Sequence, residues 1–180
     1  MTALFRSAHE ALTFAFRYAH DQSPRTPMTR MMQGGSIGSG KGLIGLDGAG
    51  QAGMILAALV HLNPEQRHVL VVRYGDLKEP CQCCGMMAPT RAWAESQDAL
   101  SHCEELADLP RVIRHAVVEK VICRRKGLRV ASLASGYEVH ERTVQRRLRD
   151  FKQRIGKVEN TALAWMDEHL TGREVLEVVA

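Results

Sequence analysis

Apolar residues recur along most of this chain at spacings of three and four, which is the period of an amphipathic α-helix. This pattern predicts helices over residues 4–20, 51–62, 64–74, 90–106 and 110–126. Asn63 and Pro64 fit the N-cap and the first turn of the third of these helices. Because no stretch alternates apolar and polar residues with the period of a strand, we expect a mostly α fold, built as a helical bundle.

Glycine, proline and serine concentrate in residues 23–50 and interrupt the helical pattern. Such a composition favours a flexible loop or linker. The chain therefore divides into an N-terminal helix (1–22), this loop (23–50), a helical region with a small cysteine-bearing insert (51–127), a helix-turn-helix (128–156) and an acidic C-terminal helix (157–180). No run of about 18 apolar residues occurs and the N-terminus lacks the apolar core of a signal peptide, so we expect a cytoplasmic protein without a membrane span.

The segment 128–156 has the pattern of two helices joined by a tight turn. Ala134, small enough to let two helices cross closely, ends a short apolar stripe with Val130 and Leu133 on the first helix. The second helix carries apolar residues at spacings of four, three and four, which fall within about 60° of one another around the helix axis: Val144, Leu148, Phe151 and Ile155. This stripe predicts one buried face and leaves the opposite face to solvent.

Basic residues concentrate around the same segment. Residues 111–154 hold 13 Lys and Arg against 4 Asp and Glu, whereas the rest of the chain holds 11 against 16. A basic block on an otherwise acidic protein is typical of a surface that binds a polyanion. The alternatives are a charged helix face that only meets water and a basic hairpin that packs on its own domain.

The residue types on the exposed face of the second helix suit reading of double-stranded DNA. Arginine can pair with guanine and glutamine with adenine, and the first turns of a recognition helix meet the base edges. We therefore predict that four residues contact bases: Glu141, Arg142, Gln145 and Arg146. Flanking cations are predicted to contact phosphates: Arg149, Lys152, Arg124, Arg125, Lys126 and Arg129.

The pattern V-x-x-L-A-x-x-Y-E-V-H-x-R-T-V-x-R-x-L, starting at Val130, resembles the DNA-binding hairpin of region four in bacterial sigma factors. Upstream, AALVHLNPEQRHVLVVRYG (57–75) is similar to the helix that precedes that hairpin. Two residues depart from the sigma pattern: Glu138 stands where a turn glycine is common, and His140 where Ser or Thr usually caps the helix. About 50 residues, including the cysteines, separate Gly75 from the hairpin, where sigma factors have a short link.

A small protein with a sigma-like hairpin and a cysteine-bearing insert resembles phage late-gene antitermination proteins of the Q type. This resemblance implies binding to DNA at a late promoter in a bacterial host cell, and contact with RNA polymerase and its sigma factor. Two alternatives remain open: a phage or bacterial repressor or activator with the same hairpin, and a DNA-targeting subunit of a transposase or packaging complex.

The chain has five cysteines, an odd number that argues against a set of paired disulfides. Cys81-Gln-Cys-Cys84-Gly85 contains the C-x-x-C-G turn of a zinc knuckle, in which two thiolates converge on one ion. Structural zinc takes four ligands, and the predicted set is Cys81, Cys83, Cys84 and Cys103, with His102, His115 and Cys123 as further candidates. The alternative is that the cysteines are free thiols, with Cys123 simply buried on its helix.

The glycine-rich stretch 35–42 matches seven positions of a phosphate-binding Walker loop and fails at the eighth. Gly42 follows Lys41 where the loop needs Ser or Thr to hold magnesium, and no strand-like sequence precedes it. The sequence therefore does not predict nucleotide hydrolysis. We expect a DNA-binding protein rather than an enzyme.

Overall fold

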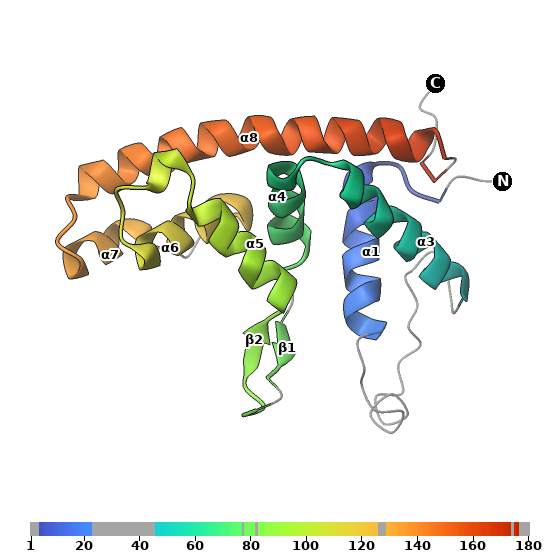
Figure 1. Cartoon of the computed structure of the whole chain (residues 1–180), viewed down its shortest axis with the longest axis horizontal. Coiled ribbons are helices and arrows are strands. Elements are labelled where there is room, and N and C mark those ends of the chain that lie inside the picture. The colour runs from blue at the N-terminus through green and yellow to red at the C-terminus, as the bar shows by residue number, and fades with distance from the viewer. Residues whose placement is uncertain are drawn as a thin grey trace. The chain divides into compact units, whose positions relative to one another are not determined.

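The computed structural model describes residues 4–22, 46–76, 78–81, 83–125, 129–173 and 175–176 (Figure 1). Within these ranges the protein is mostly helical and has one two-stranded sheet, as the sequence predicts for the fold class. Each described helix is too short or too polar to cross a membrane. The described residues do not include most of the predicted loop 23–50, in which Lys41 lies. They also leave out Lys126 and Leu128.

Seven α-helices are found among the described residues. The α-helices are α1 (Ala8–Gln22), α3 (Leu46–Ala58), α4 (Pro64–Tyr74), α5 (Arg91–Ser101), α6 (Arg111–Ile122), α7 (Val130–Gly136) and α8 (Glu141–Thr171). Two 3₁₀ turns, η1 (Leu59–His61) and η2 (Glu104–Leu106), and the strands β1 (Lys78–Pro80) and β2 (Met87–Pro89) lie between them. Since α3 begins at Leu46, the predicted loop was drawn too long at its C-terminal end.

These elements form two compact units, one made of residues 1–62 and 163–180 and the other of residues 63–162. The sequence predicts a boundary between 156 and 157, but α8 runs through it without interruption. Gly156 inside a helix costs about 1 kcal/mol relative to alanine. Apolar residues continue past it at helical spacing and are buried, with Ile155, Ala162, Met166 and Leu170 each at most 1% exposed. Packing along this stripe therefore outweighs the local preference of the glycine.

The first unit is built on the contact between α1 and α3. The sequence predicts a helix from residue 4, but α1 begins at Ala8, whose N–H donates to Asp167 Oδ1 at 2.6 Å. Residues 4 and 5 instead pair with the C-terminal segment: Leu4 N–H donates to the Val175 carbonyl, and Phe5 forms a parallel bridge with Leu176. This pairing joins the two ends of the described chain, so local sequence does not reveal it.

The second unit packs α4, α5, α6, α7 and the first part of α8 around one apolar core. Its buried residues come from every one of these helices and include Val69, Trp93, Val117, Val130 and Phe151. Trp93 also donates its indole N–H to the Val72 carbonyl at 3.1 Å, which ties α5 to α4. The predicted start of α4 is confirmed, because the Asn63 side chain accepts the Gln66 N–H in a reciprocal capping box, with Pro64 at the first helical position.

The cysteine-bearing insert contains a short antiparallel hairpin. Strands β1 and β2 pair Lys78 with Pro89, Glu79 with Ala88 and Pro80 with Met87. Three residues per strand are too few to produce a readable alternation, and the central positions are only half-buried. The hairpin therefore brings no apolar core of its own.

Truncating the buried stripe of α8 tests this packing. We expect Phe151→Ala, at a side chain with no exposed surface, to lower the free energy of unfolding by about 3–5 kcal/mol through lost burial and a cavity. Urea denaturation followed by circular dichroism measures this loss. The neighbouring exposed residue supplies the control: Gln153→Ala should change the same quantity by no more than about 0.5 kcal/mol. Equal losses in the two variants would contradict the packing described.

Candidate nucleic-acid interface and cysteine cluster

Helices α7 and α8 are joined by a four-residue turn, Tyr137–His140. Within it, the N–H groups of Tyr137 and Val139 both donate to the Ala134 carbonyl, at 3.2 and 3.0 Å. Glu138 has a φ of 55°, in the left-handed region that costs a non-glycine residue about 1–2 kcal/mol. This is the position at which the sequence comparison with sigma factors expected glycine, so Glu138 adopts the backbone conformation of the residue it replaces.

His140 performs the capping role that Ser or Thr would otherwise fill. Its Nδ1 accepts the N–H of Arg142 at 3.2 Å, and its carbonyl accepts the N–H groups of Thr143 and Val144. An acceptor nitrogen carries no proton, so this cap requires the imidazole to hold its hydrogen on Nε2. The first turn of α8 is therefore anchored to the turn that precedes it.

The apolar stripe predicted for α8 is buried in the second unit. Val144 and Ile155 are 1% exposed and Phe151 has no exposed surface, while Leu148 is half-buried against the same core. Ala134 on α7 is also buried, as its small size suggested. Burial of this stripe fixes which side of α8 faces solvent.

The solvent-facing side of α8 carries the residues predicted to contact DNA. Glu141, Arg142, Gln145, Arg146, Arg149 and Lys152 are all exposed. None of the four cations among them forms an ion pair with a described residue. Glu141 accepts a hydrogen bond from Gln145 Nε2 at 2.8 Å. The structure thus places these six residues together on one face of α8.

Other cations of α8 are held by acids of the same unit. Arg147 donates to Asp108 Oδ2 at 2.7 and 3.1 Å, and this hydrogen bond holds the pKa of the Asp108 carboxyl below its usual range. Arg154 pairs with Glu105 at 3.1 Å and with Glu65. The basic block is therefore divided into cations that fasten α8 to α4 and to the segment between α5 and α6, and cations that face water.

The predicted phosphate contacts upstream of α7 have different surroundings. Arg129 is exposed at the N-cap of α7. Arg124 lies within 3.5 Å of the buried Glu159 carboxylate, yet 66% of its side chain is exposed. Arg125 pairs with Asp76 at 2.9 Å and with Glu119, so it fastens the end of α6 to the end of α4. This internal role of Arg125 is not predicted from the sequence, because Asp76 lies 49 residues away along the chain.

A hollow of about 380 Å³ lies where α7 approaches the start of α8. Ser132, Ala134, Ser135, Val139 and Glu141 line it. The two serines are exposed, and Ser135 Oγ donates to the Ser132 carbonyl at 3.2 Å. Sequence reasoning missed these hydroxyls, because their place beside the second helix depends on the angle at which the helices cross.

Three cysteines gather in the turn between β1 and β2. The sulfur atoms of Cys81, Cys83 and Cys84 lie within 4.8 Å of one another, and the first two are 2.9 Å apart. Cys81 N–H donates to the Met86 carbonyl, and Gly85, with a φ of 71°, donates its N–H to the Cys81 carbonyl. The positive φ explains the glycine of the C-x-x-C-G turn. Three thiols so placed could hold one metal ion.

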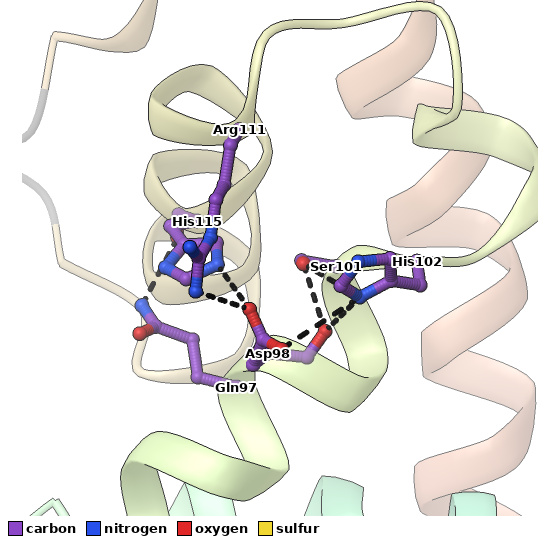
Figure 2. Close-up of polar contacts among 6 residues, drawn as sticks. All are labelled: Gln97, Asp98, Ser101, His102, Arg111 and His115. Carbon is purple, nitrogen blue, oxygen red and sulfur yellow. Dashed lines mark hydrogen bonds and ion pairs between the residues drawn. The ribbon is translucent and has the colours of Figure 1, made fainter.

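The other candidate ligands do not join this cluster. Cys103 is half-buried against the helical core, where desolvation raises the pKa of its thiol. Burial also raises the pKa of Cys123, to about 12, and its sulfur lies 3.6 Å from the Val72 carbonyl. His102 and His115 lie with Asp98 instead (Figure 2). Among the described residues, the cluster therefore consists of three sulfurs, and Cys103 is not its fourth ligand.

Figure 2 shows a polar network between α5 and α6, in which Asp98 is central. Its Oδ1 accepts from Arg111 at 2.9 Å and lies 3.1 Å from His115 Nε2. Desolvation raises the pKa of Asp98, but these partners outweigh it and hold that pKa below its usual range. Ser101 is buried and donates to the Asp98 carbonyl, which also lies 2.7 Å from His102 Nδ1. The Ser101 hydroxyl also lies 3.5 Å from His102 Nδ1, so the network lies at the C-terminal end of α5.

Among the described residues, two arrangements expose groups that a partner can reach: the junction of α7 and α8, and the cysteine cluster. The junction presents cations and an amide, and the cluster presents thiols. Compared with known proteins, the chain matches no family model, no curated protein and no solved structure.

The cysteines should differ sharply in reactivity in metal-free protein. Hydrogen bonds from Cys83 and then Cys84 lower the pKa of Cys81 to about 7, so its reactive thiolate is present above pH 7 and disappears below it. We expect iodoacetamide to modify Cys81 first, with a midpoint near pH 7. Cys123, with a pKa of about 12, should react only after unfolding. Peptide mass spectrometry of timed samples measures both rates, and modification of Cys123 before Cys81 would contradict the arrangement.

Proposed function

We propose that this protein is a DNA-binding transcription regulator that uses α7, the turn and the start of α8 as a helix-turn-helix. The observation that carries the proposal is the exposed face of α8. Four cations stand there without an ion pair to a described residue, opposite the buried apolar stripe: Arg142, Arg146, Arg149 and Lys152. The proposed role is binding rather than catalysis.

The dimensions and chemistry of this face suit the major groove. A groove about 12 Å wide admits one α-helix, and its floor offers guanine acceptors to arginine and adenine edges to glutamine. The N-terminal turns of α8 hold both residue types, in Arg142, Gln145 and Arg146. Arg149 and Lys152, one and two turns further along the helix, would reach the phosphates beside the groove.

The first helix of such a motif crosses the DNA backbone. On α7 this side offers the exposed hydroxyls of Ser132 and Ser135 and, at its N-cap, Arg129. Hydroxyls and guanidinium groups are common phosphate ligands. Arg125 is a weaker candidate than the sequence suggested, because its guanidinium already serves Asp76 and Glu119.

The finer role that we propose is late-gene antitermination through RNA polymerase and its sigma factor. It is supported by the sigma-like pattern from Val130 to Leu148 and by the cysteine-bearing insert, as a resemblance. Selection of bound DNA from a random pool, followed by polymerase pull-down, separates this role from a plain repressor or activator. A promoter-embedded site with polymerase retained supports antitermination, whereas a palindromic site protected by a dimer supports the alternative.

We further propose that the cysteine cluster supplies three of the four ligands of a structural zinc ion. Zinc–sulfur bonds of about 2.3 Å place tetrahedral ligands roughly 3.8 Å apart, a spacing that small shifts of Cys81, Cys83 and Cys84 can reach. The hairpin has only three residue pairs and exposes Met86 and Met87, 71% and 59% of their surfaces. An isolated two-stranded hairpin is marginal in water, so a metal would supply the stability that packing does not.

Substitutions on the exposed face of α8 test the DNA-binding role. On the DNA selected by the wild-type protein, Arg142→Ala and Arg146→Ala should each weaken binding about 10- to 100-fold and relax the preference at one base pair. Arg149→Ala should weaken binding to all sequences and reduce the salt slope by about one. Gel-shift titration at several salt concentrations measures both effects.

The matched control is Arg91→Ala, an exposed arginine on α5 that pairs with Glu95. It should leave both affinity and selectivity unchanged. If Arg142→Ala retained wild-type affinity and selectivity, the assignment of the reading face would be wrong.

Metal analysis tests the zinc site. Protein purified without chelators should contain about one zinc per chain, and Cys81→Ser or Cys84→Ser should lose it and melt at a lower temperature. Cys103→Ser is the control that keeps the metal, because its sulfur lies outside the cluster. Metal-free wild-type protein would sink the zinc proposal.

A further inference from the structure

The first turn of α8 holds a hydrogen bond that decides how Gln145 presents its amide. Glu141 and Gln145 stand four residues apart on the exposed side, and Gln145 Nε2 donates to Glu141 Oε1 at 2.8 Å. An ionised carboxylate only accepts hydrogen bonds. The amide must therefore turn its NH₂ group toward Glu141, which leaves its carbonyl oxygen on the other side. Chemistry alone fixes this choice between the two amide orientations.

Glu141 is itself well placed to hold another side chain. It is the first residue of α8 and follows directly on His140, whose carbonyl and ring accept the N–H groups of the first turn. Glu141 also lines the hollow between α7 and α8, together with Val139 and Ser135. The backbone that carries Glu141 is thus determined by the turn and not by the ligand.

A glutamine whose amide is already oriented by a hydrogen bond is better suited to reading adenine than one whose side chain moves freely. Adenine is read when the amide carbonyl accepts from N6 and one amide N–H donates to N7. With one N–H on Glu141, Gln145 keeps its second N–H and its carbonyl for this pair. A free glutamine would lose the freedom of its rotamers and of its amide orientation on binding, and that loss weakens the preference.

We propose that Glu141 is a positioning residue that orients the Gln145 amide for one A·T pair, and so sets specificity without touching a base. The inference rests on the proposed DNA-binding function and revises the expectation that Glu141 contacts a base. A carboxylate at this position also repels phosphates, which lowers affinity for every sequence. A role in orientation explains how it can still favour the correct site.

Two substitutions separate orientation from charge. Glu141→Gln and Glu141→Ala both remove the negative charge, so both should bind all DNA sequences more tightly. Only Glu141→Gln keeps an acceptor for Gln145, so it should retain the wild-type preference at the base pair that Gln145 reads. Glu141→Ala should reduce that preference, measured as a ratio of affinities, by about 2- to 5-fold. Competition titrations against every single-base variant of the selected site measure this ratio.

The double variant Glu141→Ala, Gln145→Ala tests whether Glu141 acts on the base preference through Gln145. Gln145→Ala should abolish the preference at one base pair, and adding Glu141→Ala to it should change that preference no further. In the free protein, NMR relaxation of the Gln145 side-chain amide should show greater mobility in Glu141→Ala than in the wild type or Glu141→Gln. This second readout needs no DNA.

Each contrary result has a distinct meaning. The inference is overturned if Glu141→Ala keeps full preference, if Glu141→Gln loses as much as Glu141→Ala, or if Glu141→Ala relaxes a different base pair from Gln145→Ala. The last result would show that Glu141 contacts a base itself. If the wild-type protein selects no DNA sequence, the proposed function fails and this inference fails with it.

Discussion

Burial of the apolar stripe on α8 is the constraint on which the proposed interface depends. Val144, Phe151 and Ile155 occupy the core of the second unit, and helical geometry then points Arg142, Arg146 and Arg149 into solvent. Turning α8 by one residue would expose part of the stripe and bring a guanidinium toward the core, where an unpaired charge costs several kcal/mol. The reading face is thus set by packing on the opposite side of the same helix.

Ion pairs divide the remaining charge of the basic block. Arg147 and Arg154 reach Asp108, Glu105 and Glu65, and Arg125 reaches Asp76 and Glu119. Exposed pairs of this kind contribute little to stability one by one, but together they orient helices whose apolar contacts tolerate some sliding. The excess of cations counted along the sequence therefore overstates the charge that a polyanion would meet. Among the described residues, four of the cations that form no ion pair lie together on one face of α8, where they would act as a group.

Local patterns predicted those elements whose determinants are close together in sequence. The cap at Asn63 and the stripe from Val144 to Ile155 are examples, since a few consecutive residues specify each. The place of Cys103 was not readable, because the packing of α5 and α6 decides whether its thiol meets core or solvent. Likewise the continuity of α8 past Gly156 depends on residues outside the helix.

The two residues that depart from the sigma-like pattern, Glu138 and His140, act together in the turn before α8. Glu138 adopts a left-handed conformation that glycine would adopt without strain, and such strain persists only where surrounding structure determines it. Here the Val139 N–H is bonded back to α7 on one side, and His140 receives the first turn of α8 on the other. The backbone on both sides of Glu138 is therefore held by hydrogen bonds. These hydrogen bonds determine where α8 starts. They thereby position the carboxylate of Glu141, which accepts the hydrogen bond from the Gln145 amide.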